Sequence, residues 1–341
     1  MEFKKKLPNA DELKKELGLS ESQEKARLIE IDRIKNILSG KDTRKIIIVG
    51  PCSADREDAV LKYMDLLAGL KEEVSDKFLI IPRIYTSKPR TSGKGYKGLV
   101  HRPNPAEQAD DIYGGILATR KMHLHIIQQT GMWGVDEMLY PEAHYYIADL
   151  LCYSSVGARS VENQQHRLVA SGLDMPVGMK NPTSGDFHVL VNAIVAAQCK
   201  QNFLYHGYEC ASDGNMYAHA ILRGYQDTSG GIHSNYHFEE ISDLYDIYQK
   251  SNAFKPSVIV DCNHSNSRKH YDEQIRIAHE VLQLCKNNKN MNRFVKGLMI
   301  ESYLVDGCQM VGENIFGKSI TDPCLGWEKT ERLIKELAEK Y

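Results

Sequence analysis

The sequence predicts an α/β fold, a (β/α)8 TIM barrel with an N-terminal helical extension. Three observations lead to this prediction. Eight short runs of strand type recur along the 341 residues, helical patterns separate most of them, and the runs are apolar on both faces. A parallel sheet covered by helices buries both faces of its strands, so this pattern favours a closed parallel barrel over an open sheet.

The N-terminal extension comes first. Apolar positions spaced among charged residues predict a helix over residues 9–39, and Ser39 and Gly40 break that pattern. We therefore expect an arm at residues 1–40 and a single barrel domain at 41–341. The chain has no internal repeat and no Pro/Gly-rich linker that would divide the barrel.

The barrel elements follow in order along the chain. The predicted strands are 45–50, 78–83, 132–137, 154–159, 176–180, 202–206, 257–262 and 297–302. The predicted helices between them include 56–74, 105–130, 160–172, 186–199, 236–250 and 267–286. Each strand with its helix forms one unit of the barrel.

Composition excludes several classes of function. Apolar residues make up 42% of the chain and charged residues 26%, which is typical of a globular protein with a proper core. A net charge of -2 leaves no basic excess for a nucleic-acid backbone or an anionic membrane. The sequence has no apolar signal segment and no stretch of about 18 apolar residues, so we expect a cytoplasmic protein. Its eight cysteines form no CxxC pair, and we expect reduced thiols.

Polar residues end several predicted strands, where barrels of this kind build their active sites. Cys52 follows the first strand, His264 the seventh and Glu301 closes the eighth, while Asp322 lies in the next loop. Taken singly, a strand-end cysteine is usually core and a lone histidine is usually just hydrogen-bonded. Together, the four donors fit one divalent ion of the Mn, Fe, Co or Zn type better than Mg or Ca.

A second group of candidate residues is cationic. Its members lie at strand ends or in the loops that follow: Arg83, Lys88, Arg90, Arg159, Lys180 and Arg223. Any one of them could be a solvated loop cation. Six cations in one barrel mouth would repel one another unless dianionic ligands lay between them, and guanidinium groups match phosphate oxygens in pairs. The sequence therefore predicts a site for two phosphates.

Nine motifs resemble those of one enzyme family, in the same order. They are GPCSAD (50–55), KPRT (88–91), YKGL (96–99), GARSVENQQHR (157–167), PVGMKNPTSGDF (176–187), GNMYAHAILRG (214–224), DCNHSNS (261–267), GLMIES (297–302) and GKSITDPCLGWE (317–328). With them the chain closely resembles the short type I 3-deoxy-D-arabino-heptulosonate-7-phosphate (DAHP) synthases. The resemblance implies a transferase that condenses phosphoenolpyruvate with erythrose 4-phosphate, the first step of the shikimate pathway to aromatic amino acids.

The resemblance also implies roles for individual residues. Cys52, His264, Glu301 and Asp322 match the family's metal ligands. The matches to its phosphoenolpyruvate contacts are Arg83, Lys88, Gly157, Ala158, Arg159, Lys180 and Arg223. Pro89, Arg90, Thr91 and Asp322 match the erythrose 4-phosphate contacts. Lys88 lies between the two substrates as a proton donor, so Lys88, His264 and Cys52 are the expected catalytic residues.

Regulation is the point where the match weakens. Tyr96 replaces a tryptophan found in many relatives, the stretch 203–214 is short, and His144, Tyr145 and Asp174 differ from the expected inhibitor pocket. Inhibition by an aromatic amino acid therefore stays open. The N-terminal arm serves assembly and inhibition in relatives, so the resemblance implies a homodimer or homotetramer.

Two alternatives compete with this interpretation. The first is 3-deoxy-D-manno-octulosonate-8-phosphate synthase, which uses arabinose 5-phosphate, but that family has a KANRS-type loop where this chain has KPRT. The second is a catalytically dead amino-acid or phosphate sensor. A dead site has no reason to keep all four ligand positions and every cation, so we rank it lower.

Overall fold

A closed barrel of eight parallel strands forms the centre of the molecule. The computed structural model describes residues 1–90, 92–107 and 109–341. In spatial order, the barrel strands are β2 (Phe78–Pro82), β1 (Lys45–Gly50), β12 (Val295–Glu301), β11 (Val258–Asp261), β8 (His219–Leu222), β5 (Val177–Lys180), β4 (Leu151–Val156) and β3 (Gly134–Glu137). A parallel bridge between Arg83 and Val135 joins the two ends of the sheet. The predicted fold class is therefore confirmed.

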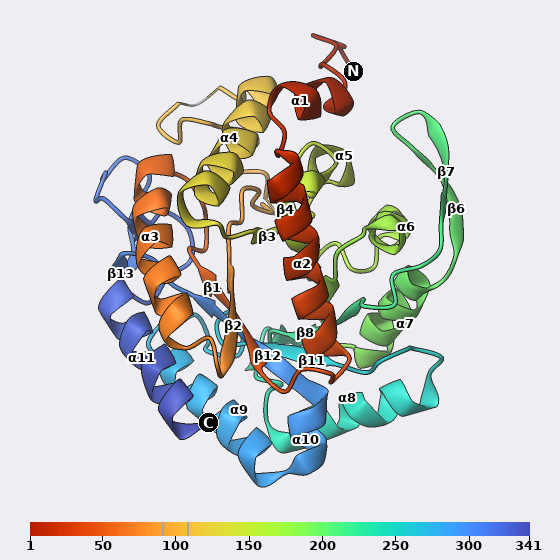
Figure 1. The fold of residues 1–341 in the computed structure, drawn as a ribbon, viewed down its shortest axis with the longest axis vertical. Helices are drawn as coiled ribbons and strands as arrows, with labels where there is room; N and C mark the ends of the chain where they lie inside the picture. The colour runs from red at the N-terminus through yellow and green to blue at the C-terminus, as the bar shows by residue number, and fades with distance from the viewer. Residues whose placement is uncertain (91, 108) are drawn as a thin grey trace.

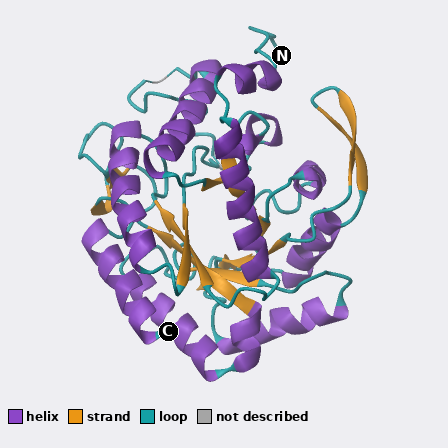
Figure 2. Cartoon of the chain, in the orientation of Figure 1, coloured by secondary structure: helices purple, strands orange, loops and turns teal. Residues whose placement is uncertain are grey.

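Helices cover the outside of the barrel (Figures 1 and 2). They are α3 (Glu57–Glu73), α4 (Ile112–Thr130), α5 (Pro141–His144), α6 (Gln164–Gly172), α7 (Phe187–Gln198), α8 (Phe238–Lys250), α9 (Glu273–Asn287), α10 (Lys289–Phe294) and α11 (Trp327–Lys340), with a 3-10 turn at Ala148–Leu150. Alternate residues of one strand face opposite sides. Ile47 and Val49 of β1 accordingly pack in the cluster beneath the helices, while Ile46 and Ile48 pack in the second cluster inside the barrel.

The N-terminal segment forms two helices instead of the single one predicted. They are α1 (Ala10–Glu16) and α2 (Glu21–Leu38), separated where Ser20 caps α2 through a reciprocal capping box with Gln23. Ile31, Ile34 and Ile37 of α2 lie on one helical face and join the cluster inside the barrel. Helix α2 therefore shares a core with the barrel, whereas a role of residues 1–40 in assembly stays a prediction.

The predicted sixth barrel strand is wrong. Residues 202–206 belong to β6 (Gln201–Tyr205), which pairs antiparallel with β7 (Tyr208–Ser212) in a hairpin that projects from the barrel (Figure 1). His206 and Gly207 form its turn, both with positive φ (50° and 81°), as a tight two-residue hairpin turn requires. The sixth barrel strand is β8, whose four residues are all buried.

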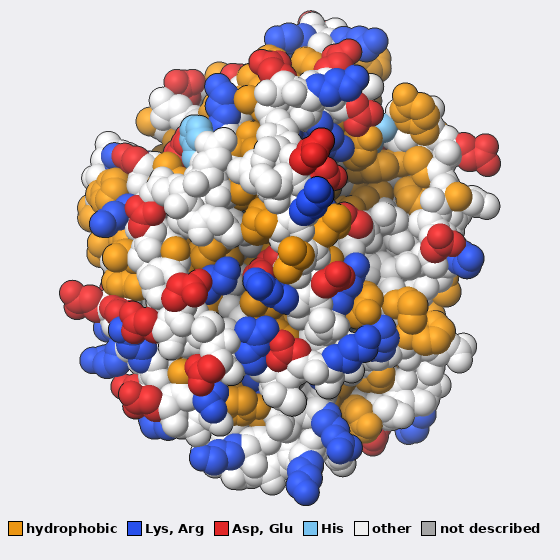
Figure 3. Space-filling model, in the orientation of Figure 1, with side chains coloured by type: hydrophobic (Ala, Val, Ile, Leu, Met, Phe, Trp, Pro, Cys, Tyr) orange, Lys and Arg blue, Asp and Glu red, His pale blue; other side chains and the backbone are white. Residues whose placement is uncertain are grey.

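Smaller elements complete the chain. The fourth strand, β4, begins and ends three residues earlier than the predicted 154–159, because it follows the short turn at Ala148–Leu150 directly. The remaining short strands form two pairs: β9 (Tyr225–Gln226) with β10 (Ile232–His233), and β13 (Val305–Cys308) with β14 (Lys318–Ser319). Among the described residues, none of the helices has the length and apolarity needed to cross a membrane. Acidic and basic side chains are interspersed over the face in Figure 3.

Candidate active site

A cavity of about 330 Å³ opens at the C-terminal ends of the barrel strands. Twelve of the predicted site residues line it: Cys52, Arg83, Lys88, Pro89, Arg90, Gly157, Ala158, Arg159, Lys180, Arg223, His264 and Asp322. Glu301 is fully buried and does not line the cavity, but one of its carboxylate oxygens lies within 4.8 Å of donor atoms of Cys52 and Asp322, which do. Thr91 lies outside the described residues. The structure thus brings together side chains from seven segments that are far apart in the sequence.

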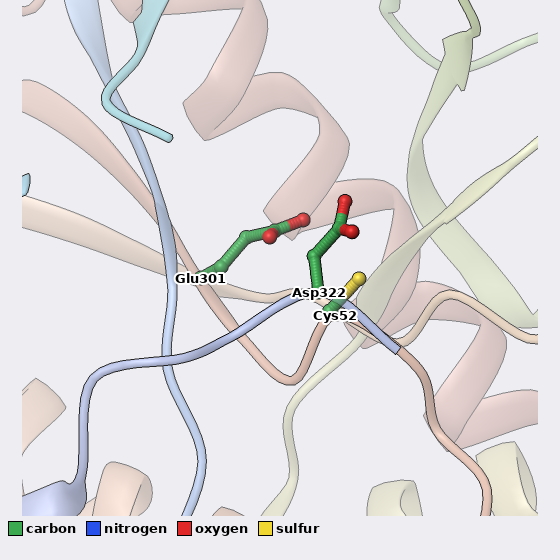
Figure 4. A group of neighbouring side chains, drawn as sticks. All are labelled: Cys52, Glu301 and Asp322. Carbon is green, nitrogen blue, oxygen red and sulfur yellow. The ribbon is translucent and has the colours of Figure 1, made fainter. Parts of the chain in front are cut away.

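The four predicted metal ligands lie close together. Donor atoms of Cys52, Glu301 and Asp322 are all within 4.8 Å of one another, and their sulfur and carboxylates converge in Figure 4. His264 joins them, with its Nε2 atom 3.8 Å from Glu301 Oε1. Parallel pairing of β1 with β12 sets Gly50 beside Glu301 and so brings the Cys52 loop to the carboxylate. A side chain at Gly50 would collide with the backbone oxygen of Arg83, 2.3 Å from its Cβ position.

The donor chemistry fits a divalent transition ion. Burial raises the pKa of the Cys52 thiol, and the charge of Glu301 raises it further. Burial also raises the pKa of Asp322, but the charges of His264 and Lys269 outweigh it and hold that pKa at about 2. The Asp322 carboxylate is thus ionised and available to a cation, whereas the Cys52 thiol would have to give up its proton to bind a metal. A thiolate, an imidazole and two carboxylates form a ligand set of intermediate softness.

Neighbouring residues orient these ligands. Glu301 accepts hydrogen bonds from Arg83 (2.7 Å) and from Asn263 Nδ2 (2.6 Å). His264 has a positive φ of 54°. Its Nδ1 atom lies 2.9 Å from Asp261 Oδ2, so its Nε2 atom faces the other donor atoms. A carboxylate behind a ligating histidine is a common feature of metal sites. Asp261 opens the motif DCNHSNS at the end of the predicted seventh strand, and no role was predicted for it.

The cations of the cavity fall into two groups. Arg83 and Lys180 are buried beside acids, since Arg83 pairs with Glu301 and Lys180 Nζ lies 3.6 Å from Glu137 and 3.7 Å from Asp261. Burial lowers the pKa of Lys180, but Tyr85 and Glu137 outweigh burial and raise it, so the ammonium stays charged. The prediction of phosphate sites assumed that these cations repel one another with no acid between them. Because Glu301, Glu137 and Asp261 lie beside Arg83 and Lys180, that prediction is weaker for this pair than for the other cations.

The second group is free to bind anions. In the part of the chain that the structure describes, Arg90, Arg159 and Arg223 form no ion pair with an acid, although all three line the cavity. Burial lowers the pKa of Arg223, an environment that favours an anionic ligand. Arg90 donates from Nε to the backbone oxygen of Tyr96 at 2.7 Å, which holds its guanidinium at the rim. These three residues support the predicted phosphate sites.

Sequence reasoning missed three charged residues of the site. Arg268 and Lys269 line the cavity, directly after the motif DCNHSNS, and both have positive φ (53° and 62°). Lys269 pairs with Asp322 at 2.8 Å. Glu137 also lines the cavity, and its position at the end of the predicted third strand was a signal that could have found it.

Comparison with known proteins gives one consistent result. Residues 19–335 match the DAHP synthetase I family. The Tyr-sensitive phospho-2-dehydro-3-deoxyheptonate aldolase of Escherichia coli K12 is 34% identical, with 97% of this chain and 92% of that protein covered. The Phe-sensitive enzyme of the same strain is 36% identical, with 89% and 86% covered.

A solved structure agrees along almost the whole length. The phospho-2-dehydro-3-deoxyheptonate aldolase from Francisella tularensis SCHU S4 superposes with a TM-score of 0.90 at 32% sequence identity, covering 99% of this chain and 98% of that one. Fold, site residues and full-length similarity all point the same way. The chain belongs to the DAHP synthetase I family.

Proposed function

We propose that the cavity at the barrel mouth is where this chain carries out the reaction of its family. The chain is a DAHP synthase: phosphoenolpyruvate, erythrose 4-phosphate and water give 3-deoxy-D-arabino-heptulosonate 7-phosphate and phosphate, the first step of the shikimate pathway. One observation carries the assignment of the site. A single cavity holds cations that have no acidic partner among the described residues, next to a compact set of possible metal donors.

Phosphoenolpyruvate takes the inner part of the cavity in this proposal. Its phosphate and carboxylate are held by cations of the cavity and by the adjoining backbone, that is Arg83, Lys88, Gly157, Ala158, Arg159, Lys180 and Arg223. The burial of Arg83 and Lys180 supports this assignment, because fixed buried cations bind a dianion more strongly than solvated ones. Their acidic neighbours keep them charged and in place between turnovers.

Erythrose 4-phosphate takes the outer part. Pro89, Arg90 and Asp322 line the same cavity nearer its rim, and Thr91 joins them by the family resemblance. Arg90 is half-buried and its guanidinium has no acidic partner among the described residues, as suits a phosphate contact. Lys88 lies between the two regions, with Nζ in contact with the backbone oxygen of Cys52 and 3.5 Å from its sulfur.

Cys52, His264, Glu301 and Asp322 would hold one divalent ion of the Mn, Fe, Co or Zn type. When bound, such an ion supplies a Lewis acid that polarises or orients the sugar aldehyde. Carbon 3 of the enol phosphate attacks the aldehyde carbon, and Lys88 donates a proton to the aldehyde oxygen as charge develops there. Water then adds at carbon 2, and phosphate leaves. Holding two dianions in register supplies several kcal/mol of the barrier reduction.

A substrate assay tests this function directly. Purified protein with Mn(II) and phosphoenolpyruvate should consume phosphoenolpyruvate when erythrose 4-phosphate is added, because the KPRT loop at 88–91 resembles the loop of the synthases that use this sugar phosphate. The loss of phosphoenolpyruvate absorbance measures the rate. Consumption with arabinose 5-phosphate instead would favour the octulosonate synthase alternative, and no consumption with any sugar phosphate would favour a sensor.

Arg90→Ala should separate the two substrates. Loss of one charge-assisted phosphate contact costs about 1.5–3 kcal/mol, so we expect KM for erythrose 4-phosphate to rise about tenfold or more. The KM for phosphoenolpyruvate should change by less than about threefold, because the substitution does not alter Arg83 or Lys180. Initial rates at varied substrate give both constants. An equal rise in both KM values would mean that Arg90 does not belong to the sugar-phosphate side.

Relatives of this chain are feedback-sensitive: their names include Tyr-, Phe- and Trp-sensitive enzymes. We propose an aromatic amino-acid site beside the N-terminal arm, where residues 5–12 line a cavity together with Tyr145, His206 and Tyr208. Ring centroids of Tyr145 and His206 lie 4.4 Å apart, which provides an aromatic wall. Asp174, also considered for this pocket, instead pairs with Arg27 at 2.8 Å and anchors α2.

Adding Phe, Tyr and Trp separately to the assay tests that site. We expect one of them to inhibit, and Tyr145→Ala to weaken that inhibition about tenfold through the loss of aromatic contact. Unchanged inhibition of Tyr145→Ala would place the inhibitor elsewhere, and no inhibition by any of the three would contradict the proposal. Light scattering on the same sample gives the oligomeric state, for which we propose a homodimer or homotetramer assembled through residues 1–40.

A further inference from the structure

A second cavity, of about 380 Å³, lies on the flank of the barrel. The segment after Leu99, helix α4 and the loop before Asp322 form its walls. Leu99, Met122, Ile315 and Ile320 supply apolar surface to it. None of these four residues belongs to the active-site cavity, so the flank cavity is a separate feature of the fold.

Two buried polar side chains of this cavity have no hydrogen-bond partner among the described residues. They are Asp55, through its Oδ1 atom, and Tyr303, through its hydroxyl. Asp55 is 8% exposed and Tyr303 is 1% exposed, and both line the cavity. A buried polar group left unsatisfied is costly, and a carboxylate more so than a neutral group.

Several other polar residues of the cavity are already engaged. The Gln309 amide donates to the backbone oxygens of Ile315 and Lys318. Arg56 makes two hydrogen bonds to the Asp58 carboxylate, at 2.7 and 2.9 Å. Among the described residues, the buried groups of this cavity that remain unsatisfied are therefore one carboxylate oxygen and one phenol, while the half-buried Lys318 adds a cation to its lining.

We infer that this flank cavity is a binding site for a small primary ammonium compound with a compact apolar body. A carboxylate only accepts hydrogen bonds, so its ligand must donate. An ammonium group carries three N–H donors, enough for Asp55 Oδ1 and for the oxygen of Tyr303 together. The apolar body packs against Leu99, Met122 and Ile320.

The electrostatics of the cavity agree with a cationic ligand. Burial raises the pKa of Asp55 to about 6, against smaller opposing effects that include its own backbone hydrogen bond and Arg56. The group is therefore an ionised but poorly solvated carboxylate at neutral pH. Burial likewise raises the pKa of Tyr303, and the charge of Asp55 raises it further, so the phenol stays neutral. A bound ammonium group would compensate the negative charge of Asp55, which is poorly solvated in its buried position.

Calorimetry with benzylamine as the probe tests the inference. We expect benzylamine to bind the full-length protein with Kd of about 1 mM or tighter, and benzyl alcohol and benzoate to bind at least about tenfold more weakly. Asp55→Asn should weaken benzylamine binding about tenfold or more, because it removes the charge while keeping the size of the side chain. Ala118→Phe, which fills the cavity from α4, should abolish it.

Glu57→Gln is the matched control. Glu57 lines the same cavity, but its side chain is 39% exposed and already contacts His125, so the substitution should leave benzylamine affinity within about twofold. The inference is overturned if benzylamine fails to bind the unchanged protein at about 1 mM, or if it binds no better than benzyl alcohol. Benzylamine binding that survives Ala118→Phe would also overturn it. This last variant keeps the test decisive even if Asp55→Asn does not fold.

Discussion

Cys52→Ala is expected to lose the metal and the activity together. The substitution removes the sulfur of Cys52, whose donor atom lies within 4.8 Å of carboxylate oxygens of Glu301 and Asp322, and it leaves these two carboxylates and the neighbouring His264 imidazole around a wider space. Metal stabilisation of transition-state charge is worth several kcal/mol, so we expect kcat to fall by about three orders of magnitude. Elemental analysis of the purified protein and the phosphoenolpyruvate assay measure the two losses on one sample.

Cys262→Ala is the matched control for this prediction. Cys262 is also a buried cysteine at the end of a barrel strand, but it packs in the hydrophobic cluster beneath the helices. Its removal should cost about 1–2 kcal/mol of stability through a small cavity and leave metal content unchanged. If Cys52→Ala retained full metal content and full kcat, the proposed ligand set would be wrong.

Glu301→Ala should combine loss of metal with a large loss of stability. Arg83 is 1% exposed and donates to Glu301 Oε1 at 2.7 Å. Removing one partner of a buried ion pair leaves an uncompensated charge and costs about 3–5 kcal/mol. Urea unfolding should show this as a lower midpoint with an unchanged slope. Asn263 loses its 2.6 Å acceptor as well, so the loop that carries His264 becomes less well held.

Glu301→Gln distinguishes the two effects. A glutamine keeps one oxygen that can accept the Arg83 hydrogen bond, so the stability loss should be smaller than for alanine. Metal affinity should still fall, because a neutral amide is a poorer ligand for a divalent ion than a carboxylate. Equal stability of Glu301→Ala and the unchanged protein would show that water or relaxation compensates Arg83, contrary to the buried geometry.

Periodicity in the sequence located seven of the barrel strands but misplaced the sixth. The segment of β6 has the pattern of a strand and does form one. Its residues are partly buried or exposed, however, and it pairs with β7 outside the barrel. β8 has only four residues and begins at His219, whose buried ring lies 2.8 Å from the Tyr153 hydroxyl inside the barrel. Strand propensity depends on what a strand packs against, so the local sequence pattern alone could not decide whether β6 or β8 is the sixth barrel strand.

The site shows a similar division. The expectation that chemistry gathers at strand ends located Cys52, His264 and Glu301, because parallel strands place their carboxyl ends on one face whatever their order. The same reasoning did not identify Asp261 as the partner of His264 Nδ1, or Lys269 as the partner of Asp322. Those contacts depend on backbone turns with positive φ, which cannot be predicted from these residue types.

The sequence by itself determined the barrel class, the near-neutral charge and the segments that carry the reactive side chains, since these follow from periodicity, composition and motif order. Only the tertiary structure decided which hairpin stays outside the barrel and which acids accompany the buried cations. It also decided that Asp55 and Tyr303 line a second cavity with no hydrogen-bond partner for Asp55 Oδ1 or the Tyr303 hydroxyl among the described residues. The reason is physical: hydrophobic patterning acts locally along the chain, whereas hydrogen-bond satisfaction and charge pairing depend on groups that meet only after the chain has closed on itself.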